Sequence, residues 1–575
     1  MKLLSLFLLL SISLLAQNKV AYPTFFEKGN GNQSADYTEV LRFYNQLDAD
    51  FETIQLQTFG LTDSGEPLRV VIFDADQKFD YKSNSAKITL LINNGIHAGE
   101  PDGIDASMQL FRDLALQKIA VPKNVIVIAI PVYNIGGLLN RNSTSRANQN
   151  GPEVYGFRGN ARNFDLNRDF IKTDTRNTQA FTQIFHHFAC PDIFIDNHVS
   201  NGADYQYKLT YIMTEPNRLG NALGEFIKTE MTPAIVKDLQ SKKVESTPYV
   251  NVWHGTPAEG FSQFSDTPRY ATGYTSLFNS LGYVVETHML KPYAERVRVT
   301  YDFMVSTLQY ADKNVTLIKN KRAENSKQYQ VGSAYPIQWT IDSSKVEKMK
   351  FLGYEGGYKP SDVTSGKRLY YDRNKPYSKE IPFYGTYKAV KYIKIPKAYV
   401  IPQGQWKVIE LLTNNQLAYM RLTKDSIIAV ESYRIVDYKT AKNAYEGHYP
   451  HSNTQVNVTK TEVKFRKGDY IFATQQTGVK YLLETLEPEA VDSFFNWNFF
   501  DTILQQKEGY SDYVFEDSAA EYLKQHPEIK AQLEEKCKQN KAFADNPEAQ
   551  LDWIYKNSPW YETAHLRFPV YRILD

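Results

Sequence analysis

The chain has 575 residues, which is too long for a single hydrophobic core, so we expect two or three domains. Its 66 Lys and Arg residues balance 65 Asp and Glu residues, and no polybasic run stands out, so the composition argues against a nucleic-acid partner. An aromatic content of 14%, with 40 Tyr, favours a β-rich, extracytoplasmic protein over a helical bundle.

The N-terminus has the pattern of a secretory signal peptide over residues 1–16. Lys2 supplies one positive charge, residues 3–15 form an apolar core, and Ala16 is a small residue before the expected cleavage point. About 13 apolar residues are few for a membrane span, and no later segment is apolar enough to be one. We therefore expect an exported protein, periplasmic or extracellular, with no transmembrane segment after cleavage.

Residues 20–318 are predicted to form an α/β domain with a mixed central sheet flanked by helices. Short apolar runs alternate with amphipathic helical patterns, and an early pair of strands suggests an antiparallel hairpin. The expected strands are 54–59, 68–73, 88–92, 125–130, 193–196 and 283–286, and the expected helices are 36–46, 178–188, 219–239 and 296–310.

The remaining sequence has a different texture. Residues 320–487 are predicted to form a β-rich accessory domain, because short apolar runs alternate there with Pro, Gly and Asn turns. The expected strands are 387–395, 398–401, 407–412 and 427–430. Residues 488–575 carry apolar side chains at helical spacing and are predicted to be mainly helical.

Polar side chains of metal-binding type follow several strands of the first domain. His97 and Glu100 come after one strand, His198 after another, and Glu286 ends a third. Ligands bind at the carboxyl ends of strands in open α/β sheets, so these residues can converge. Two His and one Glu would supply the three protein ligands of a catalytic zinc, with a second carboxylate left for proton transfer. Taken alone, the His97 and Glu100 pair is equally compatible with ordinary polar loop residues.

An Arg-rich segment lies between these residues in the sequence. Residues 157–170 contain Arg158, Arg162 and Arg168 together with Asn163 and Asn167. Guanidinium groups suit bidentate recognition of a carboxylate. A solvated basic loop is the alternative interpretation of this segment by itself. The only cysteines, Cys190 and Cys537, are far apart, so the pattern predicts no disulfide framework.

Together these motifs resemble the zinc carboxypeptidase family, the carboxypeptidase A-like metallopeptidases, over residues 20 to 315. His97-Ala-Gly-Glu100 is similar to the family's HxxE motif, and His198 to its third ligand. Asp165-Leu-Asn-Arg168 is similar to the family's D-x-N-R segment. The resemblance implies one Zn²⁺ per chain on His97, Glu100 and His198, with Asp165 bracing His97.

The resemblance also implies roles in substrate binding and catalysis. Asn167 and Arg168 would hold the free carboxylate of the substrate, Arg158 would polarise the scissile carbonyl, and Glu286 would be the general base. The family's substrate-capping tyrosine has no direct match, because phenylalanines occupy that region, and Tyr270 is the nearest tyrosine. Asp169 also departs from the family's usual Asn.

We therefore expect an exported zinc metallocarboxypeptidase that hydrolyses C-terminal peptide bonds of peptides or proteins. A zinc deacylase of N-acyl amino acids would use the same ligands. A peptidase of peptidoglycan stem peptides, with cell-wall peptides as partners, is a substrate variant suited to export. A non-catalytic binding scaffold is the remaining alternative, and the intact set of His97, Glu100, His198 and Glu286 argues against it.

Overall fold

The computed structural model of the protein describes residues 22–80 and 86–574. The predicted signal peptide, residues 1–16, lies outside the described residues. Within the described ranges, no helix is both long and apolar enough to cross a membrane.

The chain divides into two compact units. Unit 1 contains the residues up to Ile395 together with Glu410–Leu417 and Gln475–Glu484, and unit 2 contains the rest. This division differs from the expected boundaries near 318 and 487, because several strands and two later segments belong with unit 1.

Unit 1 is built on a mixed sheet of eight strands in the part of the chain that the structure describes. Their order is β1-β2-β4-β3-β5-β9-β6-β7, and the four in the middle (β4, β3, β5 and β9) run parallel. The strands are β1 (Ile54–Leu61), β2 (Pro67–Phe73), β3 (Ile88–Asn94), β4 (Val125–Ile130), β5 (Ile193–Ser200), β6 (Leu209–Met213), β7 (Ser246–Pro248) and β9 (Leu281–His288).

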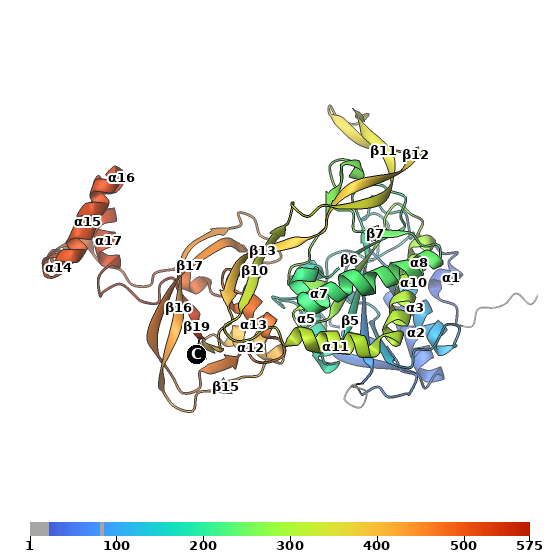
Figure 1. Ribbon diagram of the computed structural model, residues 1–575, viewed down its shortest axis with the longest axis horizontal. Helices are drawn as coiled ribbons and strands as arrows, with labels where there is room; N and C mark the ends of the chain where they lie inside the picture. The colour runs from blue at the N-terminus through green and yellow to red at the C-terminus, as the bar shows by residue number, and fades with distance from the viewer. Residues whose placement is uncertain (1–21, 81–85, 575) are drawn as a thin grey trace, which may run out of the picture. The chain divides into compact units, whose positions relative to one another are not determined.

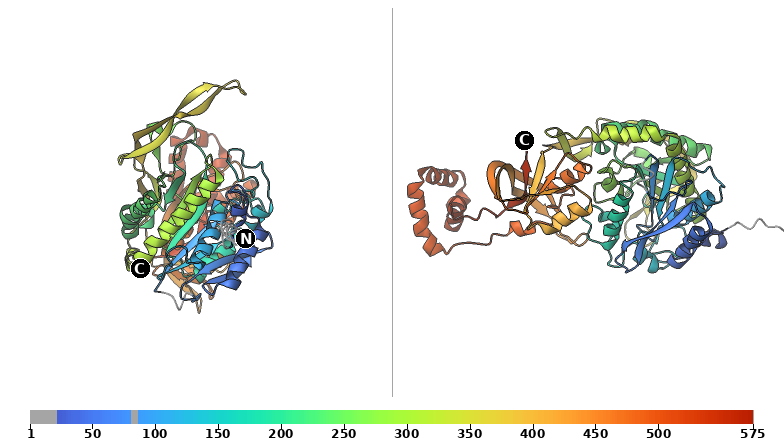
Figure 2. Two further views of the ribbon diagram at one scale, coloured as in Figure 1. Left: turned by 90° about the vertical axis from the view of Figure 1, so that its right-hand side faces the viewer. Right: turned by 90° about the horizontal axis from the view of Figure 1, so that it is seen from below.

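Helices cover both faces of this sheet (Figures 1 and 2). On β5, Phe194 packs against Phe181 of α5, whereas Asn197 contacts Met304 of α10. Side chains three positions apart on a strand point to opposite faces, so α5 and α10 lie on opposite sides. The helices are α1 (Phe25–Lys28), α2 (Tyr37–Asp50), α3 (Asp102–Ala115), α4 (Ile135–Leu139), α5 (Arg176–His187), α6 (Pro216–Leu219), α7 (Asn221–Phe226), α8 (Thr232–Ser241), α9 (Ala271–Ser276), α10 (Tyr293–Lys313) and α11 (Val315–Ser326). The predicted mixed α/β fold is confirmed.

Two smaller sheets also belong to unit 1. One pairs β10 with β13, and the other has the order β11-β12-β8. Their strands are β8 (Phe261–Ser262), β10 (Ala334–Ile341), β11 (Glu347–Pro360), β12 (Lys367–Tyr384) and β13 (Tyr387–Lys394). Because β8 precedes β9 in the sequence, the long β11–β12 hairpin is joined to a loop of the preceding α/β region.

Unit 2 contains a six-stranded sheet in the order β15-β18-β14-β19-β16-β17. Its strands are β14 (Ala398–Ile401), β15 (Met420–Arg421), β16 (Ser426–Thr440), β17 (His451–Phe465), β18 (Tyr470–Ala473) and β19 (Arg567–Ile573). The last helices are α14 (Asp512–Gln525), α15 (Pro527–Gln539), α16 (Lys541–Ala544) and α17 (Pro547–Lys556). The predicted C-terminal helices are thus present, but the chain afterwards returns as β19, which pairs with β14 and β16.

The predicted strand 407–412 is wrong, because this segment is part of helix α12 (Trp406–Asn414). Val408, Ile409, Leu411 and Leu412 are all buried, at positions that share one face of a helix. A short apolar run does not distinguish a strand from a buried helix segment. A second helix, α13 (Val479–Leu486), follows β18.

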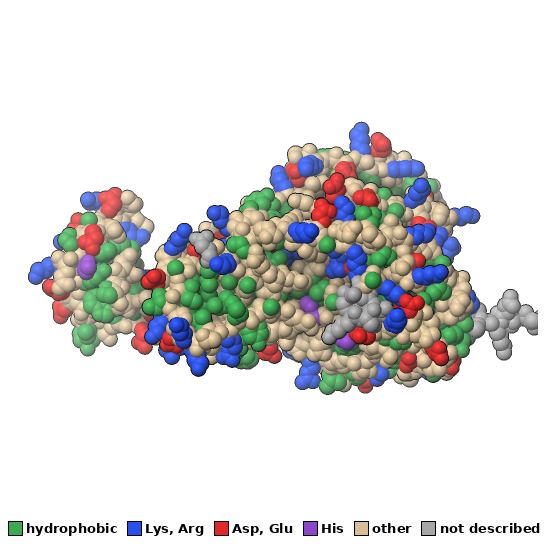
Figure 3. All heavy atoms as spheres, turned by 60° about the horizontal axis from the view of Figure 1, so that its bottom comes forward, with side chains coloured by type: hydrophobic (Ala, Val, Ile, Leu, Met, Phe, Trp, Pro, Cys, Tyr) green, Lys and Arg blue, Asp and Glu red, His purple; other side chains and the backbone are tan. Residues whose placement is uncertain are grey.

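Charges of both signs are mixed on the molecular surface. On the face of unit 1 drawn in Figure 3, Lys and Arg side chains are interspersed with Asp and Glu side chains. This distribution is what the nearly equal numbers of basic and acidic residues lead one to expect.

A buried arginine, Arg296, connects α10 to α3 and to the loop at residues 150–151. We expect its loss to destabilise unit 1. Arg296 is fully buried, with its Nε 2.8 Å from Asp102 and its Nη atoms donating to the carbonyls of Asn150 and Gly151, both at 2.8 Å. Replacing it by Met would leave a buried carboxylate unpaired, which costs about 3–5 kcal/mol. Urea unfolding of Arg296→Met measures this loss. Arg298→Met, at an exposed position of the same helix, should change stability by less than about 0.5 kcal/mol.

Candidate active site

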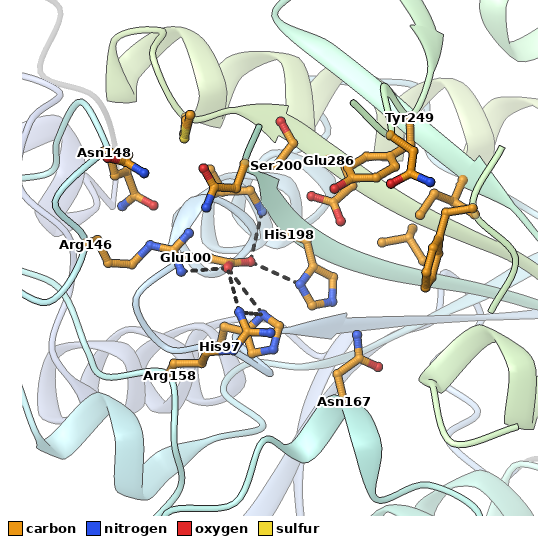
Figure 4. A pocket seen from close by; sticks show the side chains of 18 of the residues that line it. His97, Glu100, Arg146, Asn148, Arg158, Asn167, His198, Ser200, Tyr249 and Glu286 are labelled. Atoms are coloured by element: carbon orange, nitrogen blue, oxygen red, sulfur yellow. Dashed lines mark hydrogen bonds and ion pairs between the residues drawn. The ribbon is translucent and has the colours of Figure 1, made fainter. Parts of the chain in front are cut away.

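A cavity of about 660 Å³ lies at the carboxyl ends of the central strands (Figure 4). In the parallel pair β5 and β9, His198 stands directly opposite Glu286. β3 lies on the other side of β5, and the loop that follows it carries His97 and Glu100. Parallel strands bring their carboxyl ends to one edge, so three strand ends supply the functional groups. The predicted residues that line the cavity are His97, Glu100, Arg158, Asn167, Arg168, His198, Tyr270 and Glu286.

Three of these side chains form a compact donor set. His97 Nδ1 lies 3.2 Å from one oxygen of Glu100, and His198 Nδ1 lies 3.0 Å from the other. In the described part of the chain, this is the one group of three such residues whose ligand atoms all lie within 4.8 Å of one another. All three are buried. Two imidazole nitrogens and a carboxylate facing the same point fit a divalent metal of the zinc type.

The far side of each imidazole is bound by an aspartate. His97 Nε2 lies 2.9 Å from Asp165, and His198 Nε2 lies 2.9 Å from Asp196. A carboxylate at Nε2 fixes the ring and leaves Nδ1 with its lone pair toward the metal position. Although burial opposes ionisation, the neighbouring His97 and Arg158 hold the pKa of Asp165 well below its usual range. The predicted contact between Asp165 and His97 is present.

Asp196 has the same geometry but was not recognised as a site residue from the sequence. It lies two residues before His198 on β5. Side chains at positions i and i+2 of a strand share one face, so the Asp-x-His spacing was the available signal. Asp196 is fully buried, and its Oδ1 lies 3.4 Å from the side-chain nitrogen Nδ2 of Asn93.

Glu286 is one of two acidic residues that line the cavity outside the donor set, and Asp266 is the other. The Oε2 of Glu286 is buried and has no hydrogen-bond partner among the described residues. Burial raises the pKa of this carboxyl to about 8, against the opposing effect of His198. A carboxyl that is poised near neutral pH and free to accept a proton suits general acid–base chemistry.

Two arginines approach the donor set. Arg158 contacts Asp165 at 2.8 Å, and its Nη1 lies 3.3 Å from His97 Nδ1. Arg146 Nη1 lies 2.8 Å from Glu100 Oε1. Sequence reasoning missed Arg146, because it lies in the long polar segment 134–163 and no spacing relates it to a strand end.

The wall opposite Arg146 is formed by the D-x-N-R segment and the start of α9. Asp165 accepts a hydrogen bond from the backbone of Asn167 at 3.0 Å and so caps a short 3₁₀ turn, Leu166–Arg168. The side-chain oxygen of Asn167 accepts from the backbone of Ala271 at 3.1 Å. The Arg168 guanidinium lies 4.4 Å from the centre of the Tyr270 ring. Asn167, Arg168 and Tyr270 therefore form one side of the cavity.

A second tyrosine, Tyr249, lies beside Glu286 in the cavity (Figure 4). Burial raises the pKa of its phenol, and the negative charge of Glu286 acts in the same direction. Tyr249 directly follows the three-residue strand β7, which was not predicted. The sequence therefore offered no signal that would place it in the site.

The chain is similar in sequence to known proteins. The family model described as zinc carboxypeptidase matches residues 40–214. This match includes the three clustered ligands and the D-x-N-R segment and ends before β9, so Glu286 lies outside it. The chain is 22% identical to carboxypeptidase 2 of Trichophyton equinum over 450 residues, 75% of this chain and 78% of the relative. It is 21% identical to carboxypeptidase 2 of Trichophyton rubrum, over 72% and 74% of the two chains.

Solved structures also align with the chain. A metallo-carboxypeptidase from Burkholderia cenocepacia aligns at 14% identity and a TM-score of 0.36, over 49% of this chain and 70% of that one. Carboxypeptidase A from Helicoverpa armigera aligns at 12% identity and a TM-score of 0.35, over 52% and 75%. Residues 40–214 are thus similar to the zinc carboxypeptidase family, and on this match and the curated relatives the chain is a hydrolase that acts on peptide bonds.

Proposed function

We propose that the protein is an exported, zinc-dependent metallocarboxypeptidase that removes residues from the C-terminus of peptides. The observation that carries the proposal is the presence, in one cavity, of the donor set of His97, Glu100 and His198, the separate carboxyl of Glu286, and Arg168. The donor set and Glu286 suit metal-assisted hydrolysis, and the guanidinium of Arg168 suits the binding of a substrate with a free carboxylate.

His97, Glu100 and His198 would hold one Zn²⁺ per chain. A zinc ion bound by three protein ligands supplies an acidified water and polarises a carbonyl. The aspartates at the two Nε2 atoms keep both imidazoles in the tautomer that binds a metal through Nδ1. Arg146 would act as a positioning residue, because its contact with Glu100 fixes the orientation of that carboxylate.

Glu286 would move the proton of the reaction. As a carboxylate it would accept a proton from the attacking water, and it would then donate that proton to the nitrogen of the leaving amine. Its Oε2 has no partner among the described residues that would have to be displaced first. Arg158 would stabilise the negative charge that develops on the carbonyl oxygen, since its guanidinium lies at the edge of the donor set.

Asn167 and Arg168 would bind the terminal carboxylate and so define the enzyme as an exopeptidase. The stacked Tyr270 ring limits the rotation of the Arg168 guanidinium, which orders its donors before substrate binds. Tyr270 would also border the bound C-terminal residue.

Arg168→Ala should lower kcat/KM on peptides with a free C-terminus by about 10- to 100-fold, because a charge-assisted hydrogen bond is worth about 1.5–3 kcal/mol. Amidated peptides should be poor substrates of the wild type and should lose little more in the variant. Arg162→Ala is the matched control, because Arg162 belongs to the same loop, is half exposed and does not line the cavity. Equal cleavage of free and amidated peptides by the wild type would contradict the exopeptidase assignment.

A defined substrate panel separates the proposed function from its neighbours. Mass spectrometry after incubation with linear peptides, N-acyl amino acids and peptidoglycan stem peptides shows which bond is cut and from which end. We expect stepwise loss of single residues from the C-terminus of linear peptides. Exclusive cleavage of N-acyl amino acids would instead assign the site to a deacylase.

Export rests on the apolar N-terminal segment alone. We expect the mature protein recovered outside the cytoplasm to begin at Gln17, immediately after the predicted cleavage site. Determination of its N-terminal sequence tests this expectation. A protein that keeps Met1 and remains in the cytoplasmic fraction would refute it.

A further inference from the structure

Unit 1 contains a second cavity, of about 510 Å³, that shares no lining residue with the first. One of its walls is the two-stranded sheet β10–β13, and the other is formed by the junction of α6 with α7 and by the residues after α11. The side chains that matter for its chemistry are Arg218, Asn221, Gln328, Trp339, Tyr387 and Tyr392. None of them has a role in the proposed hydrolysis.

The sheet wall is aromatic. Trp339 of β10 lies opposite Ala389 of β13, so a small residue stands beside the indole, which is partly exposed. Tyr392 is 58% exposed and lines the cavity, so its ring is accessible to a ligand. The hydroxyl of Tyr387 donates to the carbonyl of Gln263 at 2.8 Å, and this bond holds its ring in place.

The opposite wall is polar and closely fitted. Gly220 has a φ of +113°, and a Cβ at this position would come within 2.6 Å of the Tyr329 hydroxyl, so only glycine fits there. Arg218 lies 6.0 Å from the centre of the Trp339 ring. Its Nε is buried and has no hydrogen-bond partner among the described residues. A buried donor without a partner is rare in proteins.

The cavity has no excess of positive charge. Lys388 lies 3.3 Å from Asp342, and Arg218 is accompanied in the lining by Glu484, which accepts a hydrogen bond from Tyr335. A phosphate or another anion would meet these carboxylates, so the charges disfavour an anionic ligand. The lining instead combines flat aromatic surface with neutral amides and one guanidinium donor.

We propose that this cavity binds a neutral oligosaccharide. A pyranose ring has a flat face of C–H groups and a rim of hydroxyls, so it needs an aromatic surface on one side and hydrogen-bonding groups on the other. Trp339 and Tyr392 provide the first, and Arg218, Asn221 and Gln328 provide the second. The guanidinium of Arg218 would donate a hydrogen bond to a hydroxyl of the sugar.

The test is isothermal titration calorimetry, in which the full-length protein is titrated separately with chitotetraose, cellotetraose and maltotetraose. We expect at least one probe to bind, and we expect Trp339→Ala and Arg218→Met each to weaken that binding by about tenfold or more. Tyr370→Ala is the control, because Tyr370 is an exposed ring of β12 outside both cavities. Glu286→Gln should bind the probe as the wild type does, which separates this proposal from the proposed hydrolysis.

Failure of all three probes to bind at about 10 mM would overturn the proposal. Unchanged binding by both Trp339→Ala and Arg218→Met would also overturn it, because the sugar would then sit elsewhere. If tetra-alanine at a similar concentration displaced a bound probe, the cavity would be assigned to a peptide ligand and the saccharide proposal would be rejected. Thermal unfolding of each variant confirms that a lost signal reports the cavity and not a lost fold.

Discussion

Glu286→Gln should lower kcat on a peptide substrate by roughly 10²–10⁴-fold, the contribution typical of a positioned general acid–base group. The amide is close in shape to the carboxyl, but it can neither accept the proton of the attacking water nor return it to the leaving amine. KM should change little, because Glu286 is not among the groups proposed to bind the terminal carboxylate. Steady-state kinetics on a peptide with a free C-terminus measure both constants.

Stability and metal content provide the controls for this variant. Burial raises the pKa of Glu286 to about 8, so its ionisation in the metal-free fold costs stability as the pH rises from about 4.5 to about 8. The amide has no charge to bury, so metal-free Glu286→Gln should be at least as stable as the wild type at neutral pH. Glu259→Gln, which alters an exposed carboxyl that does not line the cavity, should keep full activity. Full activity in Glu286→Gln would remove this residue from the mechanism.

Removal of the metal should abolish hydrolysis, and stoichiometric Zn²⁺ should restore it. Without the cation, the two imidazoles and Glu100 retain no means of polarising a carbonyl. Elemental analysis should find one zinc per wild-type chain and none in His97→Ala, since a site with one nitrogen ligand removed binds the metal too weakly to survive dialysis. Glu286→Gln should keep its zinc, which separates loss of the proton carrier from loss of the metal.

Zinc should also stabilise the fold. A ligand at 1,000 times its Kd stabilises the native state by about 4 kcal/mol, so the metal-free protein should unfold at a lower temperature than the loaded protein. His254→Ala is the matched control, because His254 is exposed and lies outside the cluster. Turnover that survives chelation, with no zinc detected, would reject the metal-dependent mechanism altogether.

Much of the site was predictable because its main residues are tied to strand ends. His97, Glu100, His198 and Glu286 each follow or end a short apolar strand, and parallel strands place their carboxyl ends at one edge in any strand order. The contact between Asp165 and His97 was predicted from the D-x-N-R motif and not from the periodicity of apolar residues. The α/β alternation likewise required only the local patterns of apolar residues.

The residues that were missed depend on the path of the chain in space. Arg146 reaches Glu100 from a long segment without regular structure, and Tyr249 follows a strand of only three residues. Neither has a periodic or spacing signal that would place it at the cavity. The error at 407–412 has another cause, because a short run of apolar residues satisfies both a strand and one face of a helix.

The strand β8 affects the order in which the enzyme can be assembled. Phe261 and Ser262 pair with Phe383 and Tyr384, so the loop leading to the cavity wall acquires its strand partner only after those later residues have been synthesised. Helix α9 follows Tyr270 on that wall, and its Tyr274 ring packs against the ring of Tyr481. A chain that folded from its N-terminus would therefore present His97, Glu100 and His198 well before the wall that carries Tyr270 was supported. The wall of the cavity would be complete only once most of the polypeptide had become available for folding.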